Sequence, residues 1–190
     1  MLSDDRYDTG AIVLHWLIAL AILALLALGW TMVLLPQSEP LRPSLFALHK
    51  SLGLTVLALT LVRIGWRLSY RAPALPGAMP AWEKAASKLG HLMFYVLMLG
   101  LPLSGWALSS TSKRNIPTIF FGLFEVPRLP VLSTLADKEP AHMAAEAVHS
   151  LAGWVLIALL VIHVGAAIRH HLVLRDSVLT RMLPRFSLPS

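Results

Sequence analysis

The chain has no cysteine and little charge. Only 14% of its 190 residues are Asp, Glu, Lys or Arg, with 16 basic and 10 acidic side chains. Without cysteine, disulfides, thiolate-bound iron–sulfur clusters, cysteine nucleophiles and the Cys-x-x-Cys-His attachment of a covalent haem are all excluded. Soluble domains usually carry charge on about a quarter of their residues, so the scarcity of charge itself argues against a soluble domain.

Apolar residues take the place of the missing charge. They make up 56% of the chain, and the mean hydropathy is +0.68, values that indicate a membrane protein rather than a soluble domain. A net charge of +6 and a pI of about 10.2 are compatible with nucleic-acid binding. The basic residues are scattered at the ends of hydrophobic runs, however, so we expect the lipid bilayer as the partner and no nucleic acid.

Four hydrophobic runs are long enough to cross a bilayer. They cover about residues 11–35, 46–68, 88–109 and 145–171. Proline-containing segments separate the runs, and the longest connection, about 110–144, includes three phenylalanines that suit the membrane interface. We therefore predict an all-α integral membrane four-helix bundle in which residues 1–190 form a single domain.

The distribution of Lys and Arg predicts the orientation of this bundle. Ten lie on one side: Arg6, Arg63, Arg67, Arg71, Lys84, Lys88, Arg169, Arg175, Arg181 and Arg185. The other side has six, spread over longer segments: Arg42, Lys50, Lys113, Arg114, Arg128 and Lys138. The positive-inside rule places the first group, and hence both termini, in the cytoplasm. The second group defines the outer side.

Two histidines of the last run point to a cofactor. His149 and His163 are fourteen residues apart, so on a helix they lie ~21 Å apart and on nearly the same face. That spacing suits two cofactors at different depths of a hydrocarbon layer ~30 Å thick. A haem held between two imidazoles needs one histidine from each of two helices at the same depth. In a chain without cysteine, any such haem is non-covalent and of the b type.

With the predicted topology, the histidines fall at two levels. His49 and His149 lie at the outer level, and His15, His91 and His163 lie at the inner level. A single intramembrane histidine can instead be a packing residue, a proton relay or a residue reaching the interface. Residues matched in depth on several helices favour cofactor ligation, because ionisable residues inside membranes are costly and usually functional. The spacing alone leaves open which inner histidines form the pair.

The second and fourth runs also align at an offset of one hundred residues, which pairs His49 with His149 and Gly53 with Gly153. A glycine one turn after each histidine leaves room for a flat macrocycle, although small residues also favour helix packing in membranes. Arg63 aligns with His163 at the inner level. Its guanidinium suits a pair of haem propionates, and the alternative is an arginine extending to the headgroups.

Three outer cations, Lys50, Lys113 and Arg114, would steer small anions if they were clustered, and otherwise they anchor helix ends. A di-iron site is rejected because Glu146 and His149 form the only Glu-x-x-His motif, whereas such a site needs two. The remaining histidines flank the fourth run, where solvated or interfacial positions are expected: His142, His170 and His171.

Several of these elements together resemble the bacterial cytochrome b561 family. They are His15-Trp16, His49-x3-Gly53 with Arg63, Gly90-His91, Phe121-Gly122 and His149-x13-His163. The likeness extends from about Tyr7 to the 179–184 stretch. The chain is most similar to the members that pass electrons from superoxide to ubiquinone, and it is also similar to the cytochrome b subunits of membrane hydrogenases and formate dehydrogenases.

The resemblance implies two haem b groups, with the inner one held by His15 and His163 and the outer one by His49 and His149. His91 then becomes a residue near the inner haem that contacts a propionate or handles protons. It further implies a superoxide:quinone oxidoreductase of the bacterial inner membrane, in which the haems pass single electrons between superoxide and ubiquinone.

Two other classes of function remain. One is an electron-transfer subunit that anchors a periplasmic hydrogenase or dehydrogenase, its redox partner, to the quinone pool. The other is a haem-free transporter or structural bundle, which a visible spectrum of the purified protein would exclude.

Overall fold

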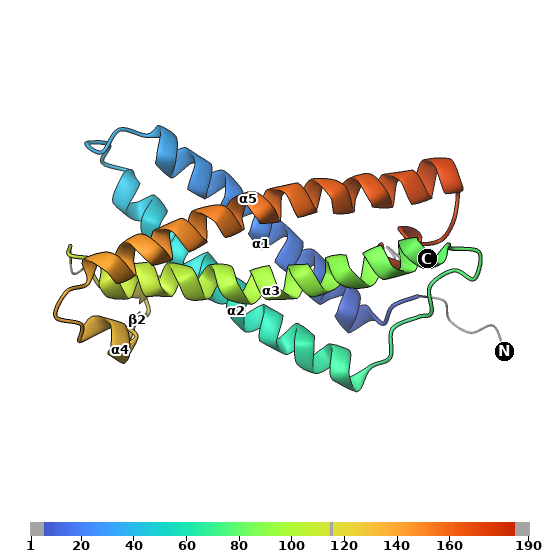
Figure 1. Ribbon diagram of the computed structural model, residues 1–190, viewed down its shortest axis with the longest axis horizontal. Helices are drawn as coiled ribbons and strands as arrows, with labels where there is room; N and C mark the ends of the chain where they lie inside the picture. Colours follow the sequence, from blue (N-terminus) through green and yellow to red (C-terminus); the bar gives the residue numbers. More distant parts are fainter. Residues whose placement is uncertain (1–5, 115, 185–190) are drawn as a thin grey trace, which may run out of the picture.

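Four long helices dominate the computed structural model, which describes residues 6–114 and 116–184 (Figure 1). They are α1 (Thr9–Leu34), α2 (Arg42–Ser69), α3 (Ala81–Thr111) and α5 (Glu139–Arg169). Each is long and apolar enough to cross a membrane. The predicted all-α membrane four-helix bundle is thereby confirmed. Arg185, counted with the inner basic residues, lies outside the described residues.

The helices extend beyond the hydrophobic runs that identified them. α3 begins at Ala81 rather than at about 88, and α5 begins at Glu139 rather than at about 145. A hydropathy pattern detects only the part of a helix inside the hydrocarbon, whereas backbone hydrogen bonding continues into the headgroup region. The extension of α3 contributes a salt bridge, 3.1 Å long, between Glu83 and Arg169 near the end of α5.

Local sequence explains where three of the helices start. Asp8 caps α1, with its carboxylate accepting from the Ala11 N–H at 3.0 Å, as expected for an aspartate at this position. α2 and α5 have a proline, Pro43 and Pro140, in their first turn. A proline is tolerated there because its missing N–H would have no intrahelical partner.

The helices form two pairs that cross (Figure 1). α1 packs along α2, α3 packs along α5, and α2 joins the pairs by packing on α3. α5, in contrast, makes only sparse direct contact with α1 and α2. The histidine pairs described below span this loosely packed boundary.

A cluster of buried apolar side chains connects all four helices: Ile18, Ile22, Val56, Leu97, Met98 and Leu156. Leu156 is seven residues from both His149 and His163. The cluster therefore lies midway between the two histidine levels. Most other large apolar side chains of the helices are exposed, and in a bilayer these would face lipid.

A short hairpin, not predicted from the sequence, follows α3. Its strands β1 (Thr118–Phe120) and β2 (Phe124–Val126) are antiparallel, with Phe120 opposite Phe124. The turn residues Phe121 and Gly122 have φ values of 44° and 77°. The buried hydroxyl of Ser51 on α2 accepts from the Phe121 N–H at 3.0 Å, and this bond helps to hold the hairpin at the end of the bundle where α2 begins. A single turn, α4 (Pro130–Ser133), then leads toward α5.

The segment after α5 folds back along the end of the bundle where α1 begins. α5 continues as a π-helix, η1 (His170–Leu174), and the chain reverses at Arg175, which has a φ of 52°. A 3-10 turn, η2 (Thr180–Met182), follows. Its backbone accepts from the Tyr7 N–H through Arg181 O and from the Trp16 indole through Met182 O. Arg181 is buried, and its guanidinium donates to Ala74 O at 2.6 Å.

The structure corrects the expectation for His170. This residue is buried, and its Nδ1 lies 2.6 Å from the Asp176 carboxylate. The chain reverses at Arg175 and so brings the Asp176 carboxylate next to His170 Nδ1. A hydrophobicity pattern does not predict such a reversal. His171 is exposed, as expected, and His142 bonds to the Thr111 hydroxyl at 3.0 Å.

Candidate functional site

The predicted outer pair meets across the bundle. His49 of α2 and His149 of α5 have ring centroids 6.3 Å apart. Two imidazoles that bind one metal atom from opposite sides, each through a nitrogen ~2 Å away, have centroids about 6 Å apart. Both rings are half-buried. The geometry of this pair therefore fits a bis-histidine metal site.

Helix α3 orients His149. The Nδ1 of His149 lies 3.1 Å from Leu101 O and 2.9 Å from Ser104 Oγ. Because a carbonyl oxygen only accepts, Nδ1 carries the ring proton and the lone pair of Nε2 stays available for a metal. This arrangement, in which the second nitrogen of a metal-binding histidine is held by a backbone carbonyl, is the usual one in metal sites.

The carbonyl that holds His149 lies next to the one proline inside α3. Pro102 follows Leu101 inside the helix, and a proline perturbs the helical hydrogen bonding of the turn before it. At Gly105, an added Cβ would lie 3.4 Å from His149 Cε1. A Cβ there would be in van der Waals contact with the imidazole, so the ring lies directly against the α3 backbone at this glycine.

His49 likewise lies against a glycine and a backbone carbonyl of a neighbouring helix, in this case α1. An added Cβ at Gly29 would lie 3.6 Å from His49 Cε1. The backbone carbonyl of Leu25, one helical turn before Gly29, is the nearby acceptor for the His49 ring. Leu25 and Gly29 of α1 thus have the same positions relative to His49 as Leu101 and Gly105 of α3 have relative to His149. The His49 Nδ1 is buried and forms no hydrogen bond of normal geometry, so this support is looser than that of His149.

The predicted inner pair is also brought together. His15 of α1 and His163 of α5 have ring centroids 6.3 Å apart, the same distance as in the outer pair. Both rings are half-buried. Phe94 of α3 packs edge-on against His163 with a centroid distance of 5.2 Å. The chain therefore forms two similar histidine pairs, each with one ring on α5 and the other on the α1–α2 pair.

Arg63 lies beside the inner pair. Its guanidinium reaches across to α1, where it lies 3.4 Å from both His15 Nδ1 and Ala11 O. A guanidinium only donates, so in this contact His15 Nδ1 is the acceptor and the ring proton is on Nε2. Metal binding through Nε2 requires the opposite tautomer and hence requires Arg63 to move away from His15.

His91 lies in the same neighbourhood. Its ring centroid is 6.0 Å from that of His163, and its Nδ1 lies 2.7 Å from Ser87 O. Its Nε2 lone pair is therefore free, as in His149. His91 is exposed, however, whereas His15 is half-buried. Distances alone do not choose between these two partners for His163, so the inner pair stays a prediction.

The glycines aligned with the outer pair leave open space. A Cβ added at Gly53 or at Gly153 would meet no atom within 4 Å outside its own helix. These positions can accommodate a flat ligand, although several other glycines of the chain are equally open.

The three outer cations have different surroundings. Lys113 makes a 2.6 Å salt bridge with Glu139, which raises the pKa of Lys113 and offsets its charge. Arg114 is exposed. Lys50, next to His49 in sequence, is partly buried and donates to Thr118 Oγ1 at 3.3 Å. The positive charge that acts on Lys50 is that of Arg128, a residue that sequence analysis did not select.

Sequence analysis also missed the residues that orient the histidines. Gly29, Leu101, Ser104 and Gly105 lie on helices other than those of the rings they contact. One feature of the sequence pointed to this part of α3: Pro102 lies in the middle of a membrane span, where a proline is expected to bend the helix.

Comparisons with known proteins identify the family of the chain. The sequence model of the family described as prokaryotic cytochrome b561 matches residues 6–185. Cytochrome b561 homolog 2 of Escherichia coli (strain K12) is 32% identical over 188 residues, which cover 97% of this chain and 95% of the relative. Cytochrome b561 homolog 1 of the same strain is 28% identical, covering 95% and 98%. A probable superoxide oxidase CybB of Yersinia pestis is 28% identical, covering 95% and 97%.

Proposed function

Because the chain belongs to the prokaryotic cytochrome b561 family, a family of haem b electron-transfer proteins of bacterial membranes, we propose that it binds two haem b groups and oxidises superoxide while reducing ubiquinone. We place it in the inner membrane, with both termini in the cytoplasm. The observation that carries the proposal is the presence of two histidine pairs with the same 6.3 Å ring separation.

The residues of each pair have defined roles. His49 and His149 would hold the outer haem, and His15 and His163 the inner one. Leu101 and Ser104 keep His149 in the tautomer that leaves Nε2 free. Arg63 would turn from His15 to a haem propionate, because a carboxylate is a stronger partner for a guanidinium than a neutral imidazole.

Haem b, when bound, supplies reversible one-electron oxidation and reduction at its iron. The protein supplies everything else: four imidazoles, an apolar cluster between the two levels, and cations near each level. The apolar cluster around Leu156 excludes water from the centre of the bundle. A positive charge such as that of Arg63 favours the reduced state of a nearby redox centre over the oxidised state.

Superoxide is proposed as the electron donor on two grounds. One relative that matches almost the whole chain is named a probable superoxide oxidase. In addition, Lys50 lies directly beside His49 in sequence, and the charge of Arg128 acts on it. Positive charge at this end of the bundle would raise the local concentration of a small anion. Lys113 and Arg114 would add a weaker, more distant field.

The first test of the proposal is stoichiometry. A pyridine haemochrome assay on purified protein, calibrated against amino-acid analysis, should approach two haems per chain. A firm value of one would contradict the two-site interpretation, and a protein that neither carries haem nor takes it up would contradict the proposal altogether.

The second test is the reaction itself. In proteoliposomes containing ubiquinone, a superoxide pulse at the outer face should reduce the haem absorbance bands and then form quinol. Superoxide dismutase should abolish both signals. Haem that is reduced by dithionite but not by superoxide would instead favour a subunit that receives electrons from a partner hydrogenase or dehydrogenase.

A further inference from the structure

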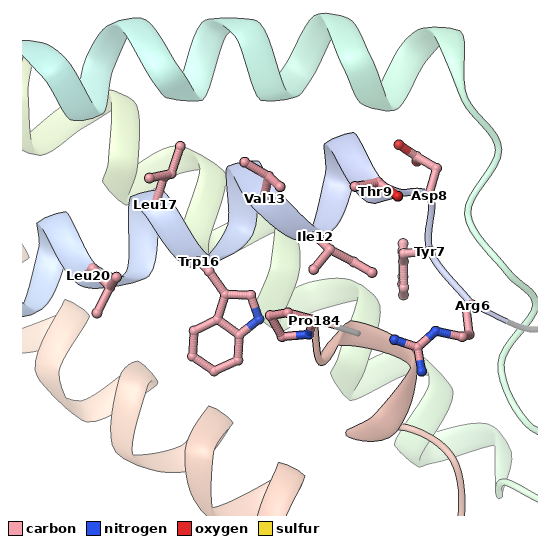
Figure 2. A pocket seen from close by; sticks show the side chains of 10 residues that line it. All are labelled: Arg6, Tyr7, Asp8, Thr9, Ile12, Val13, Trp16, Leu17, Leu20 and Pro184. Carbon is pink, nitrogen blue, oxygen red and sulfur yellow. The ribbon is translucent and has the colours of Figure 1, made fainter. Parts of the chain in front are cut away.

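A groove of about 500 Å³ runs along an exposed side of α1 (Figure 2), and none of the paired histidines lines it. Val13, Leu17 and Leu20 form its apolar floor, and the indole of Trp16 forms one wall. At the end where α1 begins, the lining becomes polar and includes Arg6. The groove thus has the amphipathic character of a site for a ligand with an apolar tail and a polar head.

The length of the groove matches one leaflet of a bilayer. The lining extends along α1 from Thr9 to Leu20, which is ~16 Å of helix. Half of a hydrocarbon layer ~30 Å thick is about 15 Å. Val13, Leu17 and Leu20 are 48%, 49% and 61% exposed. A single acyl chain of one leaflet would cover them without entering the other leaflet.

The polar end offers the positive charge of Arg6. Arg6 donates from one amino group to Leu183 O, and a guanidinium has five N–H donors. Within residues 6–114 and 116–184, no carboxylate lies within salt-bridge distance of Arg6. The neighbouring Asp8 already accepts from the Ala11 N–H and the Trp66 indole through one oxygen. Arg6 can therefore bind a phosphodiester in bidentate fashion.

We propose that this groove binds a phospholipid of the leaflet at the Arg6 end of the bundle. The phosphodiester contacts Arg6, and one acyl chain lies along Val13, Leu17 and Leu20. The length of the groove favours an acyl chain over the longer isoprenoid tail of a quinone.

Such a lipid would join two parts of the chain that meet at the groove. Trp16 donates from its indole to Met182 O at 2.8 Å, and Arg6 donates to Leu183 O. The C-terminal segment is thus hydrogen-bonded to two residues that line the groove. A ligand that binds only the assembled groove stabilises that assembly by mass action, and Trp16 is the neighbour of His15.

The proposal is tested by lipid binding to the haem-loaded protein in detergent. Native mass spectrometry with added phosphatidylglycerol or phosphatidylethanolamine should show one phospholipid retained per chain at activation energies that strip the detergent. Leu17→Trp, and independently Val13→Trp, should remove the retained lipid by filling the groove. The matched control is Leu23→Trp, because Leu23 is a 53% exposed leucine on the same helix that does not line the groove. It should retain the lipid.

The headgroup contact has its own variant and control. Arg6→Gln should weaken retention by roughly tenfold or more, as expected for the loss of a charge-assisted contact. Arg175→Gln, which removes an exposed arginine outside the groove, should have no effect. Haem content and a monodisperse elution profile identify variants that fold.

Three outcomes would overturn the proposal. One is equal retention in Leu17→Trp and Leu23→Trp, which would place the lipid elsewhere. Another is a short-chain ubiquinone that displaces the phospholipid one for one in the wild type and itself binds the wild type but not Leu17→Trp, which would assign the groove to quinone. The third is the absence of any retained phospholipid in the wild type.

Discussion

Individual histidines of this chain differ mainly in what holds their second nitrogen. Leu101 O and Ser104 Oγ hold the Nδ1 of His149, and Ser87 O holds that of His91. His15 faces the guanidinium of Arg63 instead. Because a metal takes the lone pair of the opposite nitrogen, these contacts determine which imidazoles are ready to bind and which require rearrangement.

Single replacements should separate the two sites. His49→Ala or His149→Ala should remove one haem and leave the other, and His15→Ala or His163→Ala should remove the second one selectively. His91→Ala should keep both haems while shifting a midpoint potential. Haemochrome stoichiometry and low-temperature spectra of each purified variant would measure this.

The matched control for these variants is His142→Ala, which removes a histidine of α5 that bonds to Thr111 outside both pairs. It should retain two haems. If His91→Ala lost a haem while His15→Ala retained two, the inner ligands would be His91 and His163.

Ser104 provides a finer test of the outer pair. Ser104→Ala removes the hydroxyl but leaves Leu101 O in place, so the outer haem should bind about 10-fold to 100-fold more weakly. Haem retention during dilution would measure the change. Ser109→Ala, an exchange on the same helix outside the contacts of His149, is the control. Equal retention in both variants would mean that the carbonyl alone orients the ring.

At the scale of elements, one glycine allows α1 and α2 to approach closely at Trp66. A Cβ at Gly10 would lie 2.2 Å from the indole of Trp66, which donates to Asp8 at 2.7 Å. Gly10→Ala should therefore destabilise the protein by about 1–3 kcal/mol through overpacking. Gly65→Ala meets no atom within 4 Å and should be neutral or slightly stabilising. Thermal unfolding in detergent would compare the two, and equal melting temperatures would contradict this account.

The C-terminal segment should respond to acid through Asp176. Burial raises the pKa of Asp176, but the Val178 N–H and the hydrogen bond and charge of His170, with the charge of Arg181, outweigh it and lower the pKa below 3.8. A carboxylate with a lowered pKa contributes stability that is fully present above pH ~4 and is lost as the pH falls through its folded value.

Asp176→Asn should accordingly lower the melting temperature by a few degrees at pH 7, and the difference from the wild type should shrink below pH 4. Asp137→Asn, an exposed carboxylate at the opposite end of the bundle, serves as the control. A difference that stayed constant with pH would show that the charge of Asp176 contributes nothing.

Some elements of the fold were predictable from the sequence and others were not. The four spans were predictable because lipid demands long uninterrupted apolar helices, and the histidine levels followed from the rise per residue. The β1–β2 hairpin was not predictable, because its strands have three residues each and depend on Ser51, about seventy positions earlier. The pairing of His170 with Asp176 likewise depends on a chain reversal at a non-glycine residue, Arg175.

For the whole molecule, the arrangement of the two helix pairs matters more than any single contact. α3 and α5 form one side and α1 and α2 the other, and both histidine pairs span the boundary where α5 packs only sparsely. A loosely packed boundary with histidines at two depths suits two flat cofactors, and the apolar cluster between the levels keeps the sites apart. Sequence predicted the depths but not which helices pack loosely.

The charge at the outer end of the whole molecule leads to a final prediction, about steering. Lys50→Gln should slow haem reduction by superoxide, because Lys50 and Arg128 together attract the anion. Arg114→Gln should have a smaller effect, and Lys113→Gln the smallest, because Glu139 already offsets the charge of Lys113.

The differences in reduction rate between these variants and the wild type should shrink as salt rises, since exposed charges are screened over ~8 Å at physiological ionic strength. A neutral reductant should not distinguish the variants, because steering acts only on the encounter with an anion. Stopped-flow reduction across a salt series measures all of this, and a flat salt profile with unchanged rates would leave these cations as helix anchors.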